Sequence, residues 1–223
     1  MLNKTFIKEI FESIQGEGPY VGYKQLFIRF SNCNLNCSYC DTDFKSDLKE
    51  FTPFSLIEIV KKYSNIHSIS LTGGEPLLDV SFLKEFLPLV NKKVYLETNG
   101  TLYTNLMEII NFIDIISMDV KINSSSKNGN LFNSHQKFIQ IALDNNKEIF
   151  IKLVFDENIT EEEIINTINL AKKNNILIVL QPKMNENTLC VSSYDINNIL
   201  DLFIKKYDNV RLIPQMHKFI NVQ

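Results

Sequence analysis

Three cysteines lie close together in the stretch "RFSNCNLNCSYCDTDF", which runs from residue 29 to residue 44: Cys33, Cys37 and Cys40. Thiolates in this C-x3-C-x2-C spacing can hold a metal, but a closed tetrahedral zinc site needs four ligands. The fourth zinc ligand would have to come from a distant part of the chain: Cys190, His67, His135 or His217. An iron–sulfur cube also binds thiolates and can leave one iron open for an exogenous ligand. Three adjacent cysteines therefore favour a cluster with one open corner.

The overall composition limits the class of protein. The net charge of -3 and a sequence pI of about 5.7 do not indicate a general nucleic-acid surface. The N-terminal residues contain no apolar targeting segment, and the chain has no run of about 18 apolar residues, so no membrane association is expected. Clustered cysteines do not indicate a secreted disulfide framework, and we interpret Cys190 as a small hydrophobic side chain. We expect a cytoplasmic protein.

The elements that position the cysteines alternate along the chain. Strands are expected at 24–30, 67–72, 92–98, 113–121, 147–155, 176–182 and 210–214, where apolar residues run continuously. Helices are expected at 52–64, 81–90, 104–112, 134–146, 160–174 and 193–207. Thr104 is expected to cap the third helix, and Thr160 with Glu163 to form a capping box on the fifth. The polar stretch 123–130 is expected to be a surface loop.

This strand–helix alternation predicts an α/β fold with a parallel sheet covered by helices. About six repeats favour an open, partial β/α barrel over a closed eight-stranded one. Polar residues gather where the strands end, at 33–42, 72–76, 97–100, 118–121 and 181–184. Because the carboxyl ends of parallel strands share one face, these five groups are expected to converge on one active-site mouth.

The cysteine spacing, with Tyr39 before the last cysteine, resembles the cluster motif of the radical S-adenosylmethionine (SAM) enzymes. "LTGGEP" at 71–76 is similar to the glycine-rich strand end of that superfamily. The resemblance implies an abbreviated radical SAM core. It also implies a 4Fe-4S cluster held by Cys33, Cys37 and Cys40, with SAM on the open iron. Reductive cleavage of SAM would yield a radical that abstracts hydrogen from the substrate.

Within that superfamily the chain resembles the 7-carboxy-7-deazaguanine synthases of queuosine and 7-deazapurine biosynthesis, a route to tRNA modification. The motifs that carry this likeness are "QGEG", Arg29, Asp-Thr after the last cysteine, "LETNGT", "LQP" and "VRLIPQMHKF". They span residue 13 to the end. The resemblance implies a carbon–nitrogen lyase that contracts the ring of 6-carboxy-5,6,7,8-tetrahydropterin with loss of ammonia.

Site residues follow from this resemblance, position by position. The pterin substrate would be held by Ile14, Gln15, Gly16, Arg29, Thr72 and Gln223, and Thr42 would hold Mg²⁺. SAM would be bound by Tyr39, Asp41, Gly74, Asp119, Val120, Lys121, Gln181, Pro182, Lys183 and Met184. Glu17, Glu75, Glu97 and His217 are further candidates. Glu97 and Asp119 are expected near the SAM ribose, although either could instead pair with Lys93 or Lys121. Arg29 could likewise form a surface salt bridge.

The resemblance also predicts organisation and partners. Residues 1–223 are expected to form one domain, with an N-terminal substrate-binding extension (1–25) and a C-terminal tail that closes the site. A homodimer and an electron donor such as flavodoxin or ferredoxin are implied. Two other functions remain open from the residues alone: a glycyl-radical enzyme activating protein, and a non-catalytic structural metal-binding module.

Overall fold

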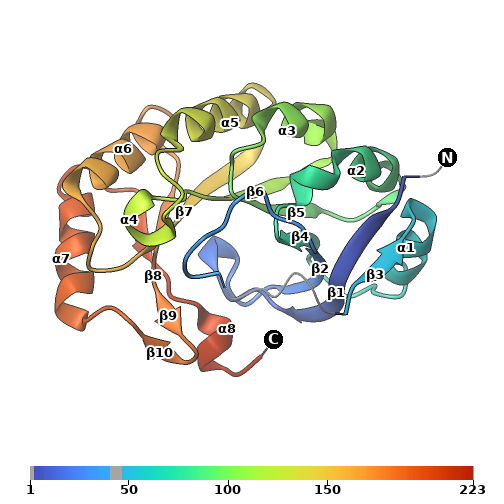
Figure 1. The fold of residues 1–223 in the computed structure, drawn as a ribbon, viewed down its shortest axis with the longest axis horizontal. Coiled ribbons are helices and arrows are strands. Elements are labelled where there is room, and N and C mark those ends of the chain that lie inside the picture. Colours follow the sequence, from blue (N-terminus) through green and yellow to red (C-terminus); the bar gives the residue numbers. More distant parts are fainter. Residues whose placement is uncertain (1–2, 41–46, 223) are drawn as a thin grey trace.

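The computed structural model describes residues 3–40 and 47–222, and within them one nine-stranded sheet forms the centre of the fold (Figure 1). Its spatial order is β11-β8-β7-β6-β5-β4-β2-β1-β3. The strands are β1 (Thr5–Ile14), β2 (Lys24–Phe30), β3 (Lys49–Phe51), β4 (Ser68–Gly73), β5 (Val94–Thr98), β6 (Ile115–Asp119), β7 (Glu148–Phe155), β8 (Ile178–Pro182) and β11 (Val210–Leu212). A separate hairpin pairs β9 (Met184–Asn185) with β10 (Thr188–Leu189).

The sheet is mainly parallel, as the sequence predicts. Each neighbouring pair from β2 to β11 is parallel, whereas β1 pairs antiparallel with both β2 and β3. The end strands β3 and β11 each pair with a single neighbour among the described residues, so the barrel is open. Strands β1 and β3 were not expected from the sequence. Because β1 pairs with β2, residues 15–23 form the connection between two neighbouring strands of the sheet.

Helices cover the convex side of the curved sheet in Figure 1. They are α1 (Pro53–Val60), α2 (Val80–Phe86), α3 (Tyr103–Ile109), α5 (Phe132–Asp144), α6 (Glu161–Lys172) and α7 (Ser193–Ile204). Two short helices, α4 (Asn123–Ser126) and α8 (Met216–Phe219), lie inside this outer row. Short 3-10 segments lie at Gly18–Tyr20, Pro76–Asp79, Leu87–Leu89 and Ile110–Phe112. In the described residues 3–40 and 47–222, no helix is long and apolar enough to cross a membrane.

Capping explains where several helices begin. The predicted box on α6 is confirmed: the Thr160 hydroxyl accepts from the Glu163 amide at 3.2 Å, and the Glu163 carboxylate accepts from the Thr160 amide at 3.0 Å. The predicted cap at Thr104 is wrong. Helix α3 starts one residue earlier, at Tyr103, with Leu102 in the cap position, so Thr104 lies inside the helix.

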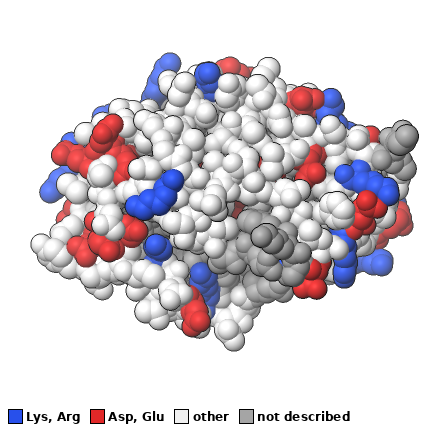
Figure 2. Space-filling model, viewed as in Figure 1, with Lys and Arg blue, Asp and Glu red and all other residues white. Residues whose placement is uncertain are grey.

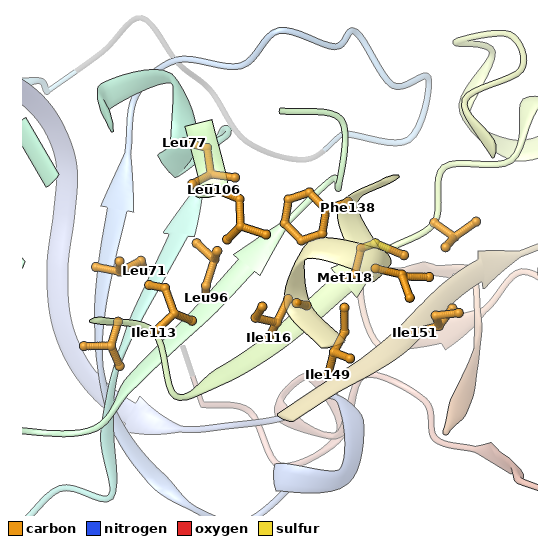
Figure 3. Close-up of a cluster of buried hydrophobic side chains, with 14 of the residues drawn as sticks. Leu71, Leu77, Leu96, Leu106, Ile113, Ile116, Met118, Phe138, Ile149 and Ile151 are labelled. Carbon is orange, nitrogen blue, oxygen red and sulfur yellow. The ribbon is translucent and has the colours of Figure 1, made fainter. Parts of the chain in front are cut away.

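The outer face of the sheet packs against the helices in a continuous hydrophobic core (Figure 3). Alternate strand residues such as Leu71, Leu96 and Ile116 point to this side and meet Leu106 from α3 and Phe138 from α5. All five side chains are 0% exposed. Burial of this apolar surface is the main source of stability for the fold, and it fixes which strand residues face the opposite, inner side.

The inner face changes character along the strands. Near the strand starts it is apolar, with Tyr95, Ile115, Phe150 and Val179 forming a separate buried cluster. The loop after β1 covers this cluster, and Tyr20 packs on it. Gly18 lies so close to the Phe150 ring that a Cβ would sit 2.7 Å from it, at a φ of +66° that favours glycine. The loop after β1 thus closes the barrel at the amino ends of the strands, and the polar carboxyl ends remain open.

The expectation of a surface loop at 123–130 is wrong for residues 123–126 and confirmed for residues 127–130, which form no helix or strand and are mostly exposed. Residues 123–126 form α4, and Ser125 and Ser126 are 2% and 0% exposed. Ser125 is buried because its hydroxyl bonds to a neighbouring segment: Ser125 Oγ donates to the Val154 carbonyl at 3.1 Å. Elsewhere on the face drawn in Figure 2, both signs of charge lie mainly along the edges and uncharged residues fill the centre.

Candidate active site

Two adjoining cavities open at the carboxyl ends of the parallel strands. The larger has a volume of about 790 Å³, and residues from all five predicted strand-end groups line it. The smaller, about 480 Å³, lies between β1, β2 and the residues after β11. The two cavities share five lining residues, which therefore lie where the cavities join: Glu17, Arg29, Thr72, Glu97 and Gln215. The predicted convergence of strand ends on one mouth is therefore observed.

The cysteine loop forms one wall of the larger cavity. Cys33 and Cys37 are partly buried, Cys40 is exposed, and all three line the cavity. The loop is folded by its own backbone, since the Cys40 amide donates to the Cys37 carbonyl at 3.1 Å. Burial raises the pKa of the Cys33 and Cys37 thiols, and the nearby charge of Lys121 opposes this effect.

An ion-pair network of Glu17, Asp119, Lys121 and Lys152 forms the floor of the larger cavity. Lys152 Nζ lies 2.5 Å from Glu17 Oε2 and 3.3 Å from Asp119 Oδ2. Lys121 Nζ lies 2.9 Å from the same Asp119 oxygen. The four side chains are between 10% and 15% exposed, and their two positive and two negative charges balance. Largely buried ions persist only when they are paired in this way.

The network controls the protonation of its members. Burial alone would raise the pKa of Glu17, but the charge and hydrogen bond of Lys152 lower it to about 2. Burial alone would lower the pKa of Lys152, and the carboxylates of Glu17 and Asp119 instead raise it well above its ordinary value. All four groups are therefore charged near neutral pH, so the floor presents fixed charges to the cavity.

Glu97 marks the boundary between the two cavities. Its carboxylate accepts from Gln15 Nε2 at 3.0 Å, Ser70 Oγ at 3.2 Å and Thr72 Oγ1 at 2.9 Å. These partners differ from the Lys93 pairing left open by the sequence. They also place Glu97 beside Gln15 and Thr72, two predicted substrate contacts. Asp119, in contrast, forms the ion pair with Lys121 that the sequence left open as an alternative to a SAM contact.

The glycine-rich strand end packs against the cysteine loop. A Cβ on Gly74 would lie 1.9 Å from the backbone oxygen of Asn32, so only glycine fits there. The next residue, Glu75, is 0% exposed and lines neither of the two cavities. It accepts from Thr98 Oγ1 at 2.9 Å and from the Asn99 amide at 2.8 Å. Burial raises the pKa of Glu75 to about 7, although these hydrogen bonds oppose the shift.

Segments from the two ends of the described chain meet over the smaller cavity. The Met216 amide donates to the Gly16 carbonyl at 2.8 Å, and a Cβ on Gly16 would lie 2.3 Å from His217 Nδ1. Gln215 Nε2 donates to Glu17 at 2.7 Å. Burial lowers the pKa of His217, while the negative charge of Glu17 opposes this shift. The "QGEG" motif is thus held in place by the residues that follow β11.

Most of the residues predicted for the site line a cavity. Those in the larger one are Cys33, Cys37, Tyr39, Cys40, Gly74, Asp119, Lys121, Gln181, Lys183 and Met184. Ile14, Gln15, Gly16 and His217 line the smaller one, and Glu17, Arg29, Thr72 and Glu97 line both. Arg29 also forms the salt bridge left open by the sequence, because its Nε lies 2.6 Å from Glu9.

A few predicted residues lie elsewhere. Val120 is packed in the hydrophobic core, and neither Pro182 nor Glu75 lines a cavity. Asp41, Thr42 and Gln223 lie outside the described residues. Cys190, interpreted from the sequence as a small hydrophobic side chain, is exposed and lines the larger cavity, because it directly follows the β9–β10 hairpin at the mouth.

Two residues of the site were not identified from the sequence. Lys152 interrupts the apolar run "IFIKLVF" in the middle of β7, and a charged side chain within a buried strand was the available signal. Gln215 lies within the motif "VRLIPQMHKF" near the C-terminus, but nothing in the sequence singled it out from its neighbours. Both hold Glu17, so they were recognisable only once the fold had brought them together.

The donor set fits an iron–sulfur cluster better than a single ion. In the parts of the chain that the structure describes, no three His, Cys, Asp or Glu side chains converge tightly enough to hold one metal ion. A cube binds each cysteine to a different iron, so its ligands stand farther apart than those of zinc. The larger cavity also contains two buried acceptors without a partner, Asp119 Oδ1 and Gln181 Oε1. They suit a ligand that carries amino or hydroxyl donors.

Comparisons with known proteins agree with this chemistry. Residues 27–190 match the family model described as "Radical SAM superfamily". A 7-carboxy-7-deazaguanine synthase from Geobacter sulfurreducens is 36% identical over 96% of this chain and 96% of its own length. One from Archaeoglobus fulgidus is 33% identical over 96% and 97%. The crystal structure of QueE from Escherichia coli aligns with a TM-score of 0.65 at 19% identity, covering 96% of this chain and 95% of that one, which supports the fold.

Proposed function

We propose roles for individual residues from one premise: the chain belongs to the radical SAM superfamily and, within it, to the 7-carboxy-7-deazaguanine synthases of queuosine and 7-deazapurine biosynthesis. It is therefore a carbon–nitrogen lyase. The glycyl-radical activating and structural metal-binding alternatives are set aside, because the likeness to these synthases covers nearly the whole chain.

We propose that the substrate is 6-carboxy-5,6,7,8-tetrahydropterin and that it lies where the two cavities join. Arg29 Nε pairs with Glu9, and the Arg29 side chain lines both cavities, so its guanidinium is placed to pair with the substrate carboxylate. The Glu97 carboxylate, fixed by Gln15 and Thr72, accepts from the N–H edge of the pterin. This assigns Glu97 to the substrate rather than to the SAM ribose.

Cys33, Cys37 and Cys40 would hold the cluster, and the floor of the larger cavity would hold SAM. Bound together, these groups supply a carbon-centred radical that abstracts hydrogen from the substrate. Asp119 Oδ1 and Gln181 Oε1 supply acceptors for SAM, while the balanced ion pairs keep the floor rigid and its net charge near zero. Loss of ammonia from the substrate then completes the ring contraction.

Three further features are proposed from the family alone. Thr42 would hold Mg²⁺, which orients the substrate, and a flavodoxin or ferredoxin would supply electrons. The enzyme would act as a homodimer. Thiolates that must stay reduced for cluster assembly fit a cytoplasmic location.

The observation that carries the substrate assignment is the joining of the two cavities at Arg29, Thr72 and Glu97, between the cysteine loop and the "QGEG" loop. Anaerobic turnover of the carboxytetrahydropterin by reconstituted protein, with and without Mg²⁺, tests it. We expect 7-carboxy-7-deazaguanine and ammonia in equal amounts. Absence of product from protein with an intact cluster and bound SAM would overturn the proposal.

A further inference from the structure

The side-chain amide of Asn128 links the turn after α4 to the cysteine loop. Its Nδ2 donates to Cys37 Sγ at 3.2 Å, and its Oδ1 accepts from the Asn36 amide at 3.1 Å. These partners fix the orientation of the amide, because reversing it would set two donors against each other at Asn36. The N–H group therefore points at the sulfur of a predicted cluster ligand.

Helix α4, just before that turn, holds the next residue of the loop through its backbone. Ser38 Oγ donates to the Ser125 carbonyl at 2.6 Å, and the Ser38 amide donates to the Ser126 carbonyl at 3.1 Å. Together with the Asn128 contacts, this gives four hydrogen bonds to three consecutive loop residues, Asn36, Cys37 and Ser38. The middle of the cysteine loop is therefore bound to one short segment.

That segment is itself anchored in the barrel. The Ser125 hydroxyl donates to the carbonyl of Val154 on β7, and the Ser124 amide donates to Glu163 at 2.8 Å. Glu163 also closes the capping box of α6, so one carboxylate serves two segments. Its pKa is lowered, because hydrogen bonds from Thr160 and Ser124 outweigh the effect of burial. Residues 123–126 therefore give the cysteine loop a support that is tied to both β7 and α6.

We propose that residues 123–128 act as a clamp on the cysteine loop and that Asn128 is a positioning residue that tunes the reduction of the cluster. Reduction adds negative charge that spreads onto the cysteine sulfurs, and an N–H donor stabilises that charge. The hydrogen bond to Cys37 therefore makes the cluster easier to reduce. This inference rests on the cluster of the proposed function, but it does not depend on the identity of the substrate.

The test is a redox titration of the reconstituted cluster without substrate, followed by the EPR signal of the reduced form. At the potential that half-reduces the wild-type cluster, we expect the ratio of reduced to oxidised cluster in Asn128→Ala to be about fivefold lower. Asn128→Asp is the second variant, since it keeps an acceptor for Asn36 but loses the donor to Cys37. We expect its potential to fall further, because it also adds a negative charge.

Asn130→Ala and Asn130→Asp are the matched controls. Asn130 lies two residues away on the same turn, and its side chain accepts from the Phe132 amide instead. These controls repeat the loss of an amide and the gain of a charge without a contact to the cysteine loop. The proposal is overturned if the Asn128 variants hold the same iron as their controls and titrate at the same potential. Because iron content and EPR signal are measured first, absence of a cluster from the wild type would instead count against the proposed function.

Discussion

Glu17 follows β1 and Glu75 follows β4, and both carboxylates are largely withdrawn from water, yet their pKa values move in opposite directions. Glu17 has Lys152 at 2.5 Å, and its pKa falls to about 2. Burial prevails at Glu75 and raises its pKa to about 7, because its hydrogen-bond donors Thr98, Asn99 and Leu77 are neutral and the charge of Lys121 is the weakest of the opposing effects.

The contrast teaches how the two sides of the mouth are built. The floor, around Glu17, consists of fixed charges that compensate one another, and it is ready to face polar ligands. The wall, around Gly74 and Glu75, is held by close backbone packing and neutral hydrogen bonds. Removing a charge should therefore reduce the stability of the protein most at the floor, whereas adding side-chain volume should reduce it most at the wall.

The largest effect is expected for Lys152→Met, which abolishes the difference between the two glutamates. It leaves Glu17 buried without its cation, so we expect the free energy of unfolding at pH 7 to fall by about 3–5 kcal/mol. Urea denaturation measures this loss. Lys62→Met, at an exposed lysine just after α1, is the control and should change stability by less than about 0.5 kcal/mol. Equal stability of the two variants would show that the floor charges are not coupled.

The pH dependence of stability separates the two glutamates directly. The folded pKa of Glu17 is below its ordinary value of 4.5, so its contribution is present above pH 4.5 and is lost as the pH falls towards 2. The folded pKa of Glu75 is above 4.5, so its contribution is present below pH 4.5 and is lost as the pH rises through 7. Each change amounts to about 3 kcal/mol at most.

Urea denaturation of Glu17→Gln, Glu75→Gln and the wild type between pH 3 and pH 8 checks these signs. The wild type should lose stability relative to Glu75→Gln as the pH rises from about 4.5 to about 7. Relative to Glu17→Gln, it should lose stability as the pH falls below about 4.5. Parallel curves for all three proteins would contradict the assignment of opposite shifts.

A smaller effect is expected where the wall is overpacked. In Gly74→Ala, the new methyl group meets the backbone of Asn32 and must displace the start of the cysteine loop. We expect the free energy of unfolding to fall by about 1–3 kcal/mol. Less iron should also be retained after reconstitution. Gly22→Ala is the control, because a Cβ there meets nothing within 4 Å and only its φ of +93° opposes the change. Thermal denaturation and iron content of both variants decide whether packing or backbone conformation limits the wall.

Much of the fold could be predicted because its signals are local. The continuous apolar runs of β5 to β8 and the capping box of Thr160 and Glu163 need only neighbouring residues, and each of these elements is confirmed. The prediction failed where a tertiary contact outweighed a local preference. Residues 123–126 form the short helix α4, in which Ser125 and Ser126 are buried, because Val154 and Glu163 satisfy polar groups of Ser125 and Ser124. Thr104 lies inside a helix that begins before it.

For the site, the sequence alone determined the chemistry, because the spacing of three thiols, the paired glycines and the order of strand ends are written along the chain. Only the tertiary structure decided which charges face one another. Lys152, Glu17 and Gln215 come from β7, the loop after β1 and the residues after β11, and their partnership depends on strand order and register. The amide of Asn128 reaches Cys37 across 91 residues for the same reason. Such contacts arise from packing of distant segments, so no local pattern encodes them.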